Sequence, residues 1–132
     1  MIDFETDIFD ECARDVLDEF PQAFVSSTEV AVPPQFPAVF IVESNNTTNK
    51  RSVDTSGEKH VNLVYTVNVY SNRVRGAKAE AKKIAGIIDK RMGFRNLRRT
   101  MLAPTPNADG SVCRYSATFV GQADAHGNLY RK

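Results

Sequence analysis

The stretch VNLVYTVNVYSN, Val61 to Asn72, alternates apolar with mostly polar side chains over twelve residues. Successive side chains of a strand point to opposite faces, so this pattern predicts a long strand that buries one face against a core. The other face would carry an outer row made of Asn62, Val64, Thr66, Asn68 and Tyr70. The chain must therefore fold around a sheet, and the outer row must meet water or another chain.

Two stretches have helical rather than strand periodicity. From Asp3 to Phe20, apolar residues recur at helical spacing between acids, and Pro21 closes the helix because the residue before a proline avoids the helical region. The sequence GAKAEAKKIAGIIDKRMG, residues 76–93, predicts a second, basic helix that stops at Gly93. Helices therefore stand at both ends of the first set of strands.

The remaining apolar runs predict further strands at residues 23–32, 38–44, 94–104 and 112–122. Residues 45–59, rich in Asn, Thr, Ser and Gly, predict an exposed polar loop or the extended tip of a hairpin. The order α-β-β-β-α-β-β favours an α+β two-layer sandwich, with an antiparallel sheet covered by two helices on one face. A chain of 132 residues fits one domain, 1–132.

The net charge of +1 conceals two oppositely charged halves. Residues 1–49 hold ten acids and one base, whereas residues 50–132 hold sixteen bases and six acids. The two halves can attract one another inside a single domain. Alternatively, a surface that is acidic in one place and basic in another suits head-to-tail contacts between identical copies. The sequence leaves both explanations open.

The search for chemical motifs favours a protein that is not an enzyme. No Gly-x-Ser-x-Gly, Gly-x-Gly-x-x-Gly or Walker sequence occurs, so we expect no catalytic residue and no cofactor. His60 and His126 have no ligand-spaced companions, and we expect no metal. Cys12 and Cys113 fit packed thiols better than a disulfide.

Basic residues leave nucleic-acid binding as an alternative. RNLRR, residues 95–99, could form a phosphate patch together with the second helix and Lys50, Arg51, Arg73 and Arg75, although the nearly balanced charge argues against it. The acidic start of the chain is unlike a secretory signal, and no window approaches the ~20 apolar residues of a membrane span. We therefore expect synthesis in the cytoplasm and no membrane partner.

The layout of the chain resembles a known family. Five features carry the resemblance: the acidic first helix, the Pro-rich passage into PAVFIVES, the polar hairpin tip, the VYTVNVYSN strand running into a Lys- and Ala-rich helix, and a closing β pair before GNLYRK. Together they resemble the tail terminator and tail completion proteins of long-tailed bacteriophages. The resemblance spans nearly the whole chain but includes no diagnostic motif.

The resemblance implies a small α+β protein of the virion, made in the host bacterial cytoplasm. It would assemble as a homo-oligomeric ring, typically a hexamer, on the head-proximal end of the tail tube. The ring would end tube polymerisation and join the neck or connector protein, with DNA only as passing cargo. Another head-tail joining or minor capsid component is the nearest alternative.

The same resemblance suggests roles for particular residues. The subunit interface would pair the acids of the first helix with basic residues of a neighbour, namely Asp7, Glu11 and Asp15 with Arg95, Arg98 and Arg99. The polar tip would contact the tube or connector through Asn46, Thr47, Lys50, Arg51 and Asp54. The outer row of the long strand would line the seam between subunits or the channel.

Overall fold

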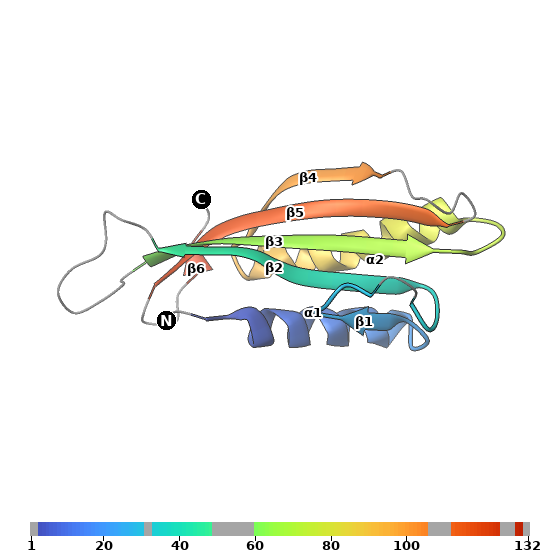
Figure 1. Ribbon diagram of the computed structural model, residues 1–132, viewed down its shortest axis with the longest axis horizontal. Coiled ribbons are helices and arrows are strands. Elements are labelled where there is room, and N and C mark those ends of the chain that lie inside the picture. The colour runs from blue at the N-terminus through green and yellow to red at the C-terminus, as the bar shows by residue number, and fades with distance from the viewer. Residues whose placement is uncertain (1–2, 31–32, 49–59, 106–111, 125–128, 131–132) are drawn as a thin grey trace.

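The computed structural model describes residues 3–30, 33–48, 60–105, 112–124 and 129–130. In chain order the elements are α1 (Glu5–Glu19), β1 (Phe24–Ser26), β2 (Ala38–Thr48), β3 (His60–Ser71), α2 (Ala77–Phe94), β4 (Arg98–Pro104), β5 (Cys113–Asp124) and β6 (Leu129–Tyr130). The sheet order is β1-β2-β3-β5-β4, and β6 pairs with β5. Both helices pack on one face of the sheet, as predicted (Figure 1). The α+β fold class is thus confirmed.

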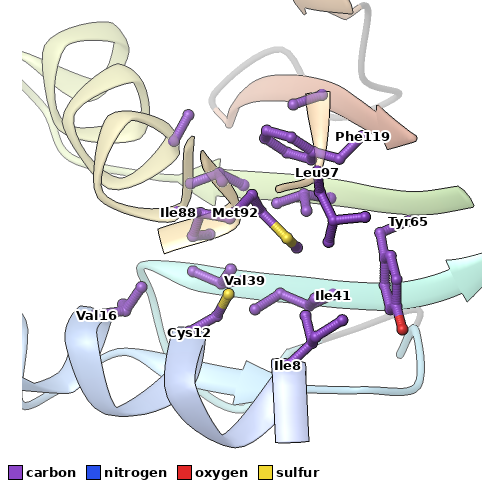
Figure 2. Close-up of a cluster of buried hydrophobic side chains, with 14 of the residues drawn as sticks. Ile8, Cys12, Val16, Val39, Ile41, Tyr65, Ile88, Met92, Leu97 and Phe119 are labelled. Atoms are coloured by element: carbon purple, nitrogen blue, oxygen red, sulfur yellow. The ribbon is translucent and has the colours of Figure 1, made fainter. Parts of the chain in front are cut away.

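β3 lies at the centre of the sheet and carries its core. It pairs antiparallel with β2 on one side and with β5 along its whole length on the other. Its inner row is at most 1% exposed and consists of Val61, Leu63, Tyr65, Val67 and Val69. In Figure 2, side chains from α1 point toward β2, while Ile88 and Met92 of α2 close the core from the other helix. The alternation of Val61–Asn72 therefore marks the strand around which both layers are built.

The sheet is mixed, so the expectation of a wholly antiparallel sheet is wrong at one edge. β1 pairs parallel with β2, and Phe24 lies beside Ala38. Parallel neighbours need a crossover connection, here residues 27–37. Within it, Glu29 Oε1 accepts a hydrogen bond of 3.0 Å from Tyr70 Oη on the sheet's outer face, the face away from the helices. The strand expected over residues 23–32 shrinks to three residues because the chain leaves the edge to cross that face.

Two element boundaries also differ from the prediction. Residues 45–48, predicted as loop or hairpin tip, continue β2 and pair with β3 after a bulge between Glu43 and Asn45. The polar composition of these residues is typical of a loop, but pairing with β3 keeps their backbone in a strand. At the other boundary, α2 continues to Phe94, and β4 begins only at Arg98. Asn96 makes the reversal between them with φ of 60°, a conformation that asparagine tolerates.

Truncating the core should destabilise the fold strongly. Ile88 is 0% exposed, and the change Ile88→Ala should lower the free energy of unfolding by about 2–5 kcal/mol, because it removes buried methyl groups and leaves a cavity. Urea unfolding measures the difference. Val74→Ala, at a side chain that is 100% exposed, is the matched control and should change little. Equal stability of Ile88→Ala and wild type would contradict this core.

Candidate interaction surfaces

An ionic seam joins α1 to α2 within the chain. Arg91 donates from Nε to Asp15 Oδ2 at 2.6 Å and from Nη2 to Asp15 Oδ1 at 3.1 Å. Glu11 Oε1 lies 3.7 Å from Arg91 Nη1 and 3.5 Å from Arg95 Nε. Glu11, Asp15 and Arg95, predicted to face a neighbouring subunit, are thus brought together inside one chain. Attraction between the two halves of a single domain accounts for these charges.

The ionic seam shifts the pKa values of Asp15 and of Cys12, which lies beneath it. The hydrogen bonds from Arg91 hold the pKa of Asp15 below its ordinary value. Beneath the seam, Cys12 is 0% exposed, and burial, followed by the charges of Asp15 and Glu11, raises the pKa of its thiol to about 12. Cys12 is therefore a packed thiol, as predicted. Cys113 is half-buried, and neither cysteine forms a disulfide.

The other predicted contact residues lie apart from the seam. Asp7 is exposed on α1, and Arg98 and Arg99 are exposed on β4 at the far edge of the sheet. Arg99 Nη1 lies 3.7 Å from Asp89 Oδ2 of α2. The structure therefore brings neither β4 arginine to α1 within one chain.

Only part of the predicted tip is described. Asn46 and Thr47 are residues of β2, where Asn46 is half-buried and Thr47 is exposed. The Thr47 hydroxyl donates to Asn45 Oδ1. Lys50, Arg51 and Asp54 lie outside the described residues.

One end of the sheet's outer face is covered and internally bonded. Phe40 is 1% exposed and packs edge-to-face between the rings of Phe24 and Tyr70, with centroid distances of 6.0 and 5.6 Å. Beside this row, Asn68 Oδ1 accepts hydrogen bonds from Ser116 Oγ at 2.6 Å and from Arg114 Nε and Nη2 at 3.2 and 3.1 Å. This network, which sequence periodicity did not indicate, fixes β3 to β5 below the crossover.

The remainder of the outer face is more open. Asn62, Val64 and Thr66 are half-buried, and Asn62 Oδ1 accepts a 3.0 Å hydrogen bond from Gln122 Nε2. The predicted outer row is therefore divided. Asn68 and Tyr70 lie at the covered end, whereas Asn62, Val64 and Thr66 lie on a partly exposed sheet surface where Asn62 and Thr66 also bond within the chain.

A groove of about 580 Å³ runs between α2 and β4 on the helix face. It forms because α2 packs mainly on β3 and β5, which leaves the edge strand less covered. The lining residues are Lys82, Arg99, Thr100, Met101, Leu102, Pro104 and Tyr115. Met101 at its edge is 42% exposed. We refer to this feature as the α2–β4 groove.

Three carboxylates meet near the start of α1, although they are distant in sequence. One oxygen from each of Asp3, Glu5 and Glu43 lies within 4.8 Å of the others, a donor set that a hard cation such as Ca²⁺ prefers. Burial raises the pKa of Glu43, and the charges of Glu5 and Asp3 raise it further, while a hydrogen bond from Tyr65 opposes the shift. Glu43 lies far along the chain from Asp3 and Glu5, so sequence spacing does not indicate this cluster.

Comparison with known proteins assigns no family. No family model matches the chain, and no curated protein is significantly similar to it. Within the described part of the chain, neither helix has the length and apolar character needed to cross a membrane. Any function must therefore be argued from the resemblance and from the surfaces above.

Removing the seam carboxylate should lower stability in a pH-dependent way. Because the folded-state pKa of Asp15 is lowered, its charge stabilises the fold above the ordinary value of 3.8, and this stabilisation is lost as pH falls through the folded-state pKa. Asp15→Asn should lower the melting temperature by a few degrees at pH 7 and by less in strong acid. Asp18→Asn, at an exposed neighbour, should have a smaller effect. A constant deficit at every pH would contradict the ionic explanation.

Removing Asn68 from its hydrogen-bond network should lower the free energy of unfolding more than removing a residue from the open part of the outer face. Asn68→Ala removes the acceptor used by Ser116 and Arg114, and leaving their donors unsatisfied should cost about 1–3 kcal/mol of unfolding free energy. Asn62→Ala is the matched control, since its amide accepts one hydrogen bond on the partly exposed surface. Guanidinium unfolding compares the two variants. An equal loss in both would mean that the Asn68 network adds nothing specific.

Proposed function

We propose that this protein is a phage tail terminator that forms a homo-oligomeric ring on the head-proximal end of the tail tube. In this role it ends tube polymerisation and presents a surface to the neck or connector protein. The proposal rests first on the family resemblance in element order and texture. The α+β fold with two helices on one face of the sheet is the architecture that this resemblance implies.

The observation that carries the proposal is the β2–β3 hairpin. Its strands, Ala38–Thr48 and His60–Ser71, extend past the N-terminal end of α1 (Figure 1). At this end β3 is also paired with β5, so β2 forms the edge of the described sheet, and this edge and its side chains can contact a partner. The polar residues Asn45 to Thr48 at this end lie on strand rather than loop, so they are presented on an ordered backbone. Such an arm suits contact with the end of a tube.

The bonding of two polar side chains, Asn68 and Asp15, supports a structural role for these groups rather than catalysis. Asn68 is committed to Ser116 and Arg114, and Asp15 is committed to Arg91. These bonds stabilise the domain and hold its layers together. The exposed surfaces include the hairpin, the open part of the sheet and the α2–β4 groove, and each is a place for protein contact.

The experiment combines ring formation with tube capping. The purified chain is measured by light scattering from low to high salt and viewed by electron microscopy. It is then added to tail tube protein from the phage that carries its gene. Rings and tubes of arrested length are expected. A chain that neither forms rings nor arrests tubes would contradict the proposal, and salt-sensitive retention of duplex DNA would favour the nucleic-acid alternative.

A shortened hairpin tests the arm directly. Thr48 and Val61 are paired, so replacing residues 49–60 with Asn-Gly should close a two-residue turn without changing the register. We expect a folded variant that still forms rings but no longer arrests tube growth, because the predicted contact residues Lys50, Arg51 and Asp54 are removed. The readouts are melting temperature, native mass and tube length. Full capping by this variant would remove the arm from the tube contact.

A further inference from the structure

The outward face of α1 carries charge that the ionic seam does not use. Glu11 and Asp15 turn toward Arg91 of α2. Asp7 and Asp10 lie exposed on the outer side of the same helix, and Arg14 is exposed one turn after Asp10. Asp18 instead lines a pocket between α1 and α2 together with Lys90 and Arg91. We refer to Asp7 and Asp10 as the α1 acidic face. The two carboxylates lie about one turn apart on a rigid element, so one basic groove could contact them together.

The α2–β4 groove carries the opposite charge. Lys82 and Arg99 line it, and Lys78 lies one turn before Lys82 on the same side of α2. Asp89 of α2 lies 3.7 Å from Arg99 and offsets part of its charge, so Lys78 and Lys82 supply most of the positive charge of the groove. Its volume of about 580 Å³ leaves room for incoming side chains, and Leu102, paired with the buried Ala117, adds apolar surface on the helix face. The groove thus combines cations with a concave surface.

The two surfaces lie on opposite sides of the molecule. In Figure 1, α1 runs along the lower side and β4 along the upper side, because β1 and β4 are the two edges of the main sheet path. Two different, complementary surfaces on opposite sides of one chain produce head-to-tail contacts. Such contacts close into rings when the rotation between neighbours permits. A contact between two identical patches would yield only a dimer.

We infer that the α2–β4 groove binds the α1 acidic face of a second copy of this chain. The inference rests on the proposed function and specifies its subunit interface. A second copy is the occupant because the chain itself supplies an acidic face of matching charge, one for every groove. Each subunit then offers its groove to one neighbour and its acidic face to the other. The seam residues Glu11, Asp15 and Arg95 stay inside each subunit.

Charge reversal with mutual rescue tests this interface. Asp7→Lys with Asp10→Lys makes both surfaces basic, and Lys78→Glu with Lys82→Glu makes both acidic. Each variant alone should associate on the order of tenfold more weakly than wild type at low salt, since like charges oppose one another. An equimolar mixture should recover ring-sized species, because every contact then pairs opposite charges. Light scattering reports mass, and melting temperature reports folding.

A control keeps the change of charge but moves it off the groove. Arg75→Glu alters net charge as the single groove variant Lys82→Glu does, from an exposed position that does not line the groove. This control should form rings as wild type does. Rings that survive both reversals, or a mixture that does not recover them, would overturn the inference and leave the proposed function standing. A wild-type chain that forms no ring at any salt concentration and arrests no tube would overturn both.

Another occupant of the groove would give a different result. If duplex DNA bound wild type at low salt and not the Lys78→Glu, Lys82→Glu variant, the groove would be a phosphate site. That outcome would overturn the inference in favour of nucleic acid. The expected result is that both proteins bind DNA equally weakly.

Discussion

The position of β3 between β2 and β5 is the constraint on which the remaining structure depends. Its ladders with both neighbours fix the register, and its inner row meets both helices. A shift of one residue would turn Tyr65 and its row outward and bring Asn68 into the core. The sheet would lose apolar burial, and the Asn68 amide would be buried among apolar groups. The helices, the edge strands and the hairpin arm are all placed relative to this one strand.

Charge acts at two levels in this molecule. Between the two helices, Arg91 pairs with Asp15 and Glu11, and Arg95 lies beside Glu11. Partial burial and the bidentate geometry of Arg91 with Asp15 favour pairing within the chain. At the periphery, the α1 acidic face and the α2–β4 groove lie at opposite sides, too far apart to satisfy one another. The uneven distribution of charge along the sequence thus supports folding where the helices touch and leaves complementary surfaces where they do not.

The sequence predicted those elements whose formation depends on neighbouring residues. The helical periodicity ending before Pro21 and the alternation through Val61–Asn72 both correspond to observed elements because burial of one face is visible in sequence spacing. Contacts between distant residues were not visible. Arg91 and Asp15 are 76 positions apart, and the parallel pairing of β1 follows from where the crossover passes rather than from its composition. Asn45 to Thr48 resemble a loop in composition, yet a paired neighbour holds them extended.

The crossover has one more consequence. Because α1 packs against the inner side of β2 and residues 27–37 reach Tyr70 on the outer side, the N-terminal third of the chain grips the sheet from both faces. The short β1 strand connects the contact of α1 on the inner side with the contact at Tyr70 on the outer side, so loss of one contact weakens the other. Amide hydrogens of α1, β1 and the start of β2 should therefore open together as a single cooperative unit, distinct from the β3–β5 centre. The edge of the sheet is protected by topology as well as by packing.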